Sequence, residues 1–165
     1  MSTTDDLLAN ARSYAPGFDR GGLGARPERR VAVVACMDAR LDPARVLGLR
    51  EGDAHVIRNA GAVVTDDVIR SLTISQRLLG TEEIMVVQHT GCGMLTFSGT
   101  ELHDIIESET GIRPVWAAET FRDLDAEVRQ SMARIHASPF LASKKSVRGF
   151  VYDVADGTLR EVGPA

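Results

Sequence analysis

Apolar and polar residues follow two kinds of pattern along the chain, one typical of strands and one typical of helices. Largely apolar stretches, typical of strands inside a sheet, occupy residues 31–36, 54–61, 83–89 and 147–155. Longer stretches with apolar residues at helical spacing occupy residues 65–80, 99–111 and 121–137, and a weakly amphipathic stretch covers residues 2–14. Alternation of strands and helices predicts an α/β domain built on a mostly parallel β-sheet flanked by helices.

Capping and turn residues support these boundaries. The helix expected at 65–80 begins with a Thr or Asp cap and ends at Gly80. Asp156 and Gly157 form a hairpin turn signal, so residues 158–162 are expected to form an antiparallel edge strand. If the second strand lies outside the first, the order of the parallel strands is 2-1-3-4.

Size and charge exclude several classes of protein. The 165 residues, 44% of them hydrophobic, suffice for one domain, which we expect to span residues 1–165. A net charge of -4 gives no basic surface, so nucleic acid is not an expected partner. No apolar run approaches the ~18 residues of a membrane span, and the start lacks the features of a signal peptide. We expect a cytoplasmic protein without a membrane partner.

The two cysteines of the chain stand near the ends of predicted strands. Cys36 ends the strand at 31–36, His89 ends the strand at 83–89, and Cys92 follows three residues later. In a reducing compartment such cysteines are functional thiolates or core residues rather than a disulfide. Ligands of open α/β sheets sit beyond the carboxyl ends of the strands, where the strand order reverses. The order 2-1-3-4 would bring these three side chains together there.

Two thiolates and one imidazole are a ligand set for zinc, and three protein ligands leave a fourth position free, as catalytic sites do. Asp38 and Arg40 follow Cys36 at alternate positions, so that in an extended chain the three share a face. We predict that Arg40 holds the Asp38 carboxylate in a charge-assisted pair. Asp38 then either orients a metal-generated hydroxide or binds the metal itself and closes the site.

The motifs at these residues resemble those of the β-class carbonic anhydrases, in particular the short bacterial and archaeal members. Cys-x-Asp-x-Arg stands here as "CMDAR" (36–40), and His-x-x-Cys-Gly stands as "HTGCG" (89–93). The match extends to "HVIRNAG" (55–61) and "SVRGFVYDV" (146–154), so that it covers nearly the whole chain. Together these motifs are highly specific, whereas His-x-x-Cys alone is weak.

The resemblance implies one zinc ion per subunit, bound by Cys36, His89 and Cys92. It implies an Asp38–Arg40 pair and the reversible hydration of carbon dioxide to bicarbonate and a proton by a metal-hydroxide mechanism. It further implies a homodimer or a dimer of dimers, in which residues 1–26 form an N-terminal arm whose helix packs on a partner subunit. The expected substrate pocket contains Met37, Asn59, Ala60, Gly61, Val63 and Gly93. The alternative for the apolar Met37 and Val63 is that they only pack in the core.

Two other functions fit the same ligands. Carbonyl sulfide and carbon disulfide are linear and apolar like carbon dioxide, so a hydrolase for them on the same scaffold is one alternative. A non-catalytic zinc or thiol module that senses redox state or bicarbonate is the other, and a permanent bond from Asp38 to the metal would favour it. Gly91 stands where related sequences often carry a larger or acidic residue. The smaller glycine would open the edge of the site.

Overall fold

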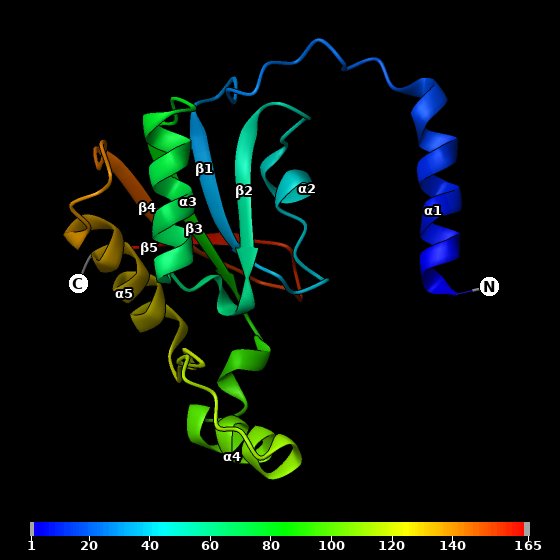
Figure 1. Ribbon diagram of the computed structural model, residues 1–165. Coiled ribbons are helices and arrows are strands. Elements are labelled where there is room, and N and C mark those ends of the chain that lie inside the picture. Colours follow the sequence, from blue (N-terminus) through cyan, green and yellow to red (C-terminus); the bar gives the residue numbers. More distant parts are fainter. Residues whose placement is uncertain (1, 164–165) are drawn as a thin grey trace.

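The computed structural model describes residues 2–163 and contains one five-stranded sheet (Figure 1). Its strands are β1 (Val31–Cys36), β2 (Ala54–Asn59), β3 (Glu83–His89), β4 (Ser146–Tyr152) and β5 (Leu159–Val162). The order is β2-β1-β3-β4-β5; the first four strands are parallel, and β5 pairs antiparallel with β4. The predicted strand order and antiparallel edge strand are confirmed.

The helices are α1 (Thr3–Tyr14), α2 (Pro43–Leu47), α3 (Asp66–Arg77), α4 (Gly99–Thr110) and α5 (Leu124–Ala137), with short 3-10 turns η1 (Ala15–Gly17), η2 (Ala60–Ala62) and η3 (Gly93–Leu95). Three of them, α2, α3 and α5, cover the two faces of the sheet. Helices α3 and α5 pack on the face that carries Ala32 and Val34, while α2 packs on the face that carries Val33 and Ala35. Because both faces are covered, β1 is apolar throughout.

Several local features differ from the sequence prediction. Strand β4 ends at Tyr152 rather than residue 155, and helix α3 ends at Arg77 rather than residue 80. The second strand ends at Asn59 rather than residue 61, because Gly61 adopts a φ of 77° inside η2, where a Cβ would lie 2.8 Å from Phe121. Helix α5 begins at Leu124 rather than residue 121, because the Asp123 carboxylate accepts a hydrogen bond from the backbone N–H of Ala126 and caps the helix. The short helix α2 was not predicted.

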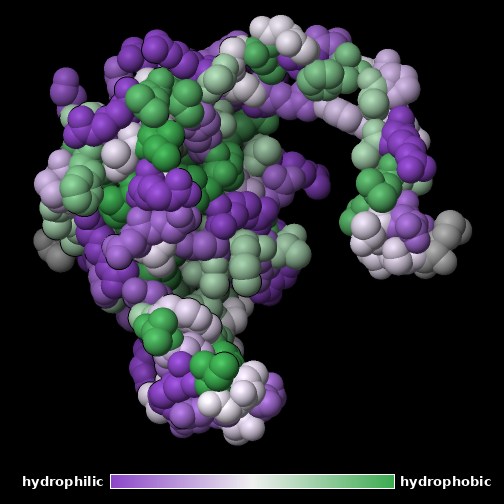
Figure 2. Space-filling model, in the orientation of Figure 1, coloured by the Kyte–Doolittle hydropathy of each residue, from purple (hydrophilic) through white to green (hydrophobic). Residues whose placement is uncertain are grey.

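Two helices extend away from the sheet (Figure 1). Helix α1 stands apart from the body at the end of a long connection to β1, and none of its residues is buried. Figure 2 shows hydrophobic surface on this helix, where Leu7 and Leu8 are exposed. Helix α4 projects from another side of the body, below the sheet in the view of Figure 1, and also contains no buried residue. The body and these two extensions therefore differ in how completely they bury their apolar side chains.

Within residues 2–163, no helix combines the length and the apolar character that crossing a membrane requires.

Candidate metal centre

Three side chains of metal-binding type meet at the carboxyl edge of the sheet. Cys36 is the last residue of β1, His89 is the last residue of β3, and Cys92 lies in the loop before η3. Their ligand atoms all lie within 4.8 Å of one another, and all three residues are buried. The two strands are adjacent and parallel, so their carboxyl ends emerge side by side. The structure thus brings together the three residues that the sequence singled out.

The histidine presents one free nitrogen to the two cysteines. Nδ1 of His89 lies 2.9 Å from the carbonyl oxygen of Thr90, which can only accept, so Nδ1 carries the hydrogen. Nε2 is then an acceptor, and it is buried without a hydrogen-bond partner among the residues described. A metal-binding histidine usually donates a hydrogen bond from its other ring nitrogen, which fixes the orientation and tautomer of the ring. This unpartnered nitrogen beside two thiols fits a zinc ion.

The two thiols also suit a metal. The Sγ atoms of Cys36 and Cys92 are 4.0 Å apart, about twice the length of a disulfide bond. The hydrogen bond between them lowers the pKa of Cys36 to about 4 and raises the pKa of Cys92 above its usual range. One thiol of the pair is therefore already disposed to ionise, and the thiolate is the form that binds metals.

Asp38 is held at the edge of this group by Arg40. Nε of Arg40 donates to Oδ1 of Asp38 at 2.9 Å, Nη2 donates to Oδ2 at 2.8 Å, and the backbone N–H of Arg40 donates to Oδ1 at 2.9 Å. These bonds hold the pKa of Asp38 well below its usual range. Oδ2 remains 3.6 Å from Nε2 of His89. The carboxylate is thus ionised, oriented and close to the three ligands.

The route by which Arg40 reaches Asp38 differs from the prediction. An extended chain with alternating side chains was expected, but the strand ends at Cys36 and the chain then turns, as the 3.1 Å bond from the N–H of Leu41 to the carbonyl of Asp38 shows. The turn folds the Arg40 side chain back over the Asp38 carboxylate. The expectation of strand-like alternation past Cys36 was therefore wrong.

Gly91 contributes through its backbone. Its φ is 61°, a left-handed conformation that glycine adopts without a steric penalty. Its carbonyl oxygen accepts a 3.0 Å hydrogen bond from Nη2 of Arg40. Arg40 therefore bridges the loop after β1 and the loop after β3. The glycine supports the Asp38–Arg40 pair as well as leaving the edge of the site free of a side chain.

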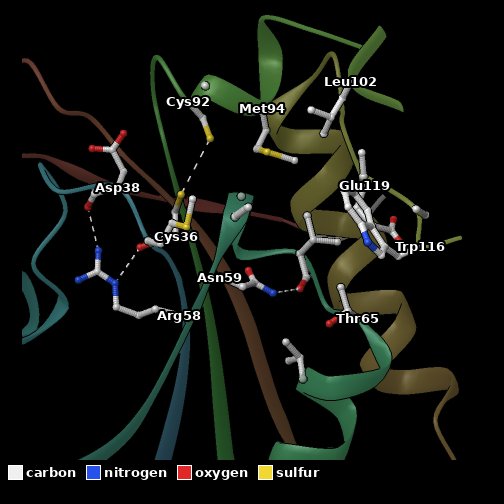
Figure 3. Close-up of a pocket in the computed structure, with 18 of the residues that line it drawn as sticks. Cys36, Asp38, Arg58, Asn59, Thr65, Cys92, Met94, Leu102, Trp116 and Glu119 are labelled. Carbon is white, nitrogen blue, oxygen red and sulfur yellow. Dashed lines mark hydrogen bonds between the residues drawn. The ribbon is translucent and has the colours of Figure 1, made fainter. Parts of the chain in front are cut away.

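Arg58 is a site residue whose role the sequence did not reveal. Its Nε donates to the carbonyl of Cys36 at 3.0 Å, and its Nη2 donates to the carbonyls of Asp38 and Leu41, each at 2.8 Å. Figure 3 shows its guanidinium beside Asp38 and Cys36. Arg58 thus holds the backbone of the whole loop after β1. The available signal was a lone arginine at the end of a strand next to a ligand-bearing loop.

An apolar cavity of about 860 Å³ opens beside the ligands (Figure 3). All of the expected pocket residues line it, namely Met37, Asn59, Ala60, Gly61, Val63 and Gly93, as do Cys36, Asp38 and Cys92. The sequence did not predict the opposite wall, which comes from the region of α4 and includes Phe97, Leu102 and Trp116. His103 packs edge-on against the Trp116 ring, with ring centroids 5.3 Å apart. An apolar wall of this kind suits a small uncharged ligand.

Comparison with known proteins links this geometry to a family. Residues 31–159 match the family model described as "Carbonic anhydrase". The chain is 58% identical over 164 residues to "Beta-carbonic anhydrase 1" of Mycobacterium tuberculosis, covering 99% of this chain and 100% of that protein. It is 33% identical over 162 residues to "Carbon disulfide hydrolase" of Saccharolobus solfataricus, covering 84% and 79%. The crystal structure of carbonic anhydrase from Streptococcus mutans superposes with a TM-score of 0.93 at 40% identity, covering 99% of each chain.

Proposed function

The chain belongs to the β-carbonic anhydrase family, and on this premise we propose that it is a zinc enzyme for the reversible hydration of carbon dioxide to bicarbonate and a proton. One observation carries the proposal: a buried Cys36–His89–Cys92 group, with a free His89 nitrogen, opens onto an apolar cavity beside an oriented carboxylate. The three candidate ligands and the carboxylate lie together at one edge of the sheet, and the cavity opens beside them.

Cys36, His89 and Cys92 would hold one zinc ion per subunit. Zinc bound by three protein ligands lowers the pKa of water and so supplies hydroxide near neutral pH. The free nitrogen of His89 and the ionisable thiol of Cys36 match what such an ion requires.

The residues around the ligands orient the reactants. Asp38 is an acceptor only, because its carboxylate is ionised, and it therefore accepts a hydrogen bond from the O–H of the attacking oxygen and directs a lone pair toward carbon dioxide. Arg40 occupies both carboxylate oxygens and so keeps Asp38 from binding the metal. If Arg40 released it, Asp38 would become a fourth ligand and close the site. The apolar wall takes up carbon dioxide and excludes water from it.

We extend the proposal to assembly and location. The exposed apolar residues of α1, among them Leu7 and Leu8, support an arm at residues 1–26 that packs on a partner subunit in a homodimer or a dimer of dimers. Met1 lies outside the described residues, as do residues 164–165, which belong to the proposed single domain. The unlinked thiols of Cys36 and Cys92 support a reducing, cytoplasmic location.

Hydrolysis of carbon disulfide or carbonyl sulfide is the second candidate. A relative that shares a third of its residues with this chain is named a carbon disulfide hydrolase, and these substrates have the same linear, apolar shape as carbon dioxide. The 58% identity to a protein named as a carbonic anhydrase favours carbon dioxide. The choice rests on the shape of the cavity, so each gas has to be tested directly.

The test is stopped-flow hydration of carbon dioxide by zinc-loaded protein from neutral to alkaline pH, with carbon disulfide and carbonyl sulfide assayed in parallel. We expect hydration rates that rise with pH. Asp38→Asn keeps the shape of the side chain and removes its charge, and we expect it to lower the rate by roughly 100-fold with zinc content unchanged. Hydration at the wild-type rate by this variant would remove Asp38 from the mechanism. Stoichiometric zinc without turnover of any gas would instead indicate a sensor module.

A further inference from the structure

Thr90 directly follows His89, and its carbonyl oxygen is the group that orients the His89 ring. Nδ1 of His89 donates to this carbonyl at 2.9 Å, which leaves Nε2 as a free acceptor beside the two thiols. The orientation of a metal-binding histidine depends on such a bond. Whatever holds the Thr90 carbonyl in place therefore also holds the candidate ligand.

The peptide group that carries this carbonyl joins Thr90 to Gly91. Gly91 has a φ of 61°, and glycine restricts the backbone less than any other residue. Arg40 holds the far side of Gly91 through the 3.0 Å hydrogen bond to the Gly91 carbonyl. The near side of the peptide is held separately, by the contacts of Thr90.

Thr90 is bonded to the chain at the end of β4. Its N–H donates to the carbonyl of Tyr152 at 2.9 Å. Its hydroxyl accepts from the backbone N–H of Val154 at 3.1 Å and donates to Oδ1 of Asp153 at 3.3 Å. The backbone and the side chain of Thr90 thus contact three consecutive residues of the neighbouring strand and its loop.

The loop between β4 and β5 holds Asp153 independently of Thr90. The N–H of Asp153 donates to the carbonyl of Thr158 at 2.8 Å, and the N–H of Gly157 donates to the carbonyl of Asp153 at 2.9 Å. Oδ1 of Asp153, the atom that meets Thr90, also accepts from the N–H of Ala155 at 2.8 Å. The Thr90 hydroxyl therefore has a partner whose own position is fixed by the hairpin.

We propose that the Thr90 hydroxyl and the Asp153 carboxylate position His89 for metal binding, by holding in place the carbonyl that accepts from Nδ1. The proposal rests on the proposed function, because it takes His89 as a zinc ligand. Both are positioning residues, since they act through the Thr90 carbonyl and neither lines the cavity. The hairpin of β4 and β5 thus supports the metal centre from outside the cavity.

The test measures the zinc affinity of the full-length protein by competition with a chromophoric chelator. Thr90→Val keeps the volume of the side chain and removes its hydroxyl. We expect the dissociation constant for zinc to rise about tenfold, the lower end of what loss of an outer-shell contact costs. Thr90→Ser keeps the hydroxyl and should bind zinc as the wild-type protein does. Wild-type affinity in Thr90→Val would overturn the proposal.

Thr158→Val is the matched control, because it removes a similar hydrogen bond from the same hairpin. The Thr158 hydroxyl donates to Oδ1 of Asp156 at 2.7 Å. We expect Thr158→Val to leave the zinc affinity unchanged, whether or not its melting temperature falls. An equal loss of zinc affinity in the two valine variants would show that the hairpin contributes only stability, and the proposal would fail.

The His89 ring provides a readout that general stability does not move. In zinc-loaded wild-type protein, the hydrogen on Nδ1 should give an NMR signal protected from exchange with water. We expect this signal to be lost in Thr90→Val and retained in Thr90→Ser, and equal protection in Thr90→Val would contradict the proposal. Wild-type protein that binds zinc without hydrating carbon dioxide would refute the proposed function alone, because neither measurement depends on turnover. Wild-type protein that binds no zinc would refute both.

Discussion

The metal centre and the N-terminal helix are opposite extremes of the same chain. At the metal centre, Cys36, His89 and Cys92 are all buried, and hydrogen bonds from Arg40 and Arg58 hold the loop around them. Helix α1 buries none of its residues. The three candidate ligands thus all come from one chain and are buried in it, whereas the apolar side chains Leu7 and Leu8 of the helix are exposed.

This difference shows which interactions the chain supplies by itself. Burial of apolar area repays the entropy of ordering a segment, and a helix of 12 residues is only marginally stable alone in water. Helix α1 has a capping box at Ser2 and Asp5, which fixes its start but adds no packing. On the proposed assembly its order comes from a partner subunit, whereas the arrangement of the candidate ligands comes from the sheet.

The largest effect we expect comes from removing a proposed ligand of the metal centre. Cys92→Ser replaces one proposed ligand by a side chain of nearly the same size, so that packing around it in the core changes little. We expect zinc affinity to fall by more than the ~100-fold that loss of an outer-shell partner costs, and hydration to fall to background. Competition with a chromophoric chelator measures the affinity, and far-ultraviolet circular dichroism checks the fold. A variant that retains zinc and activity would show that the ligand set is wrong.

A smaller effect should follow from loosening the same region without touching a ligand. Arg58→Ala leaves three carbonyls of the loop after β1 without their donor. We expect hydration to drop by about 10- to 100-fold and the melting temperature to fall by at least about 2 °C. Arg45→Ala, at an exposed position of α2, is the matched control and should change neither. Equal behaviour of the two variants would make Arg58 an ordinary surface arginine.

The smallest effect on the metal centre should come from changing helix α1. Replacing Leu7 and Leu8 together by Glu puts charge on the exposed apolar positions of α1. Sedimentation equilibrium should then show self-association weakened by at least about tenfold, with zinc content per chain unchanged. Asn10→Glu adds charge to the same helix without removing an apolar side chain, and should leave assembly as it was. Unchanged association of the leucine variant would exclude α1 from the interface.

The sequence predicted those parts of the molecule that local patterns encode. Continuous apolar runs marked β1 and β3, and the residues at their ends, Cys36 and His89, were placed correctly at one edge of the sheet. Helix α2 has only five residues, too few to repeat the helical period of 3.6 residues and so reveal it in the sequence, although Asp42 and Gly48 cap its ends. Its one sequence signal was therefore the caps.

Other parts depend on contacts between distant segments. The cavity wall at Phe97 and Trp116 depends on where the excursion through α4 returns to the body, which no local pattern states. The contacts of Arg58 depend on the turn of the loop after Cys36, where the expected alternation of side chains fails. Residue types thus indicated the candidate ligands, whereas the groups that hold and enclose them became visible only in the tertiary structure.

The separation of the two cysteines along the chain determines when the metal centre can form. Cys36 and Cys92 are 56 residues apart, and β2 and α3 lie between them. Bringing the cysteines together closes a long loop, whose entropy must be offset by pairing of β1 with β3. Unlike a zinc finger, in which the metal drives folding of a short peptide, this chain must assemble its sheet before a complete ligand set exists. If the chain binds zinc as proposed, the metal would bind late in folding, and removing it should leave a folded sheet behind.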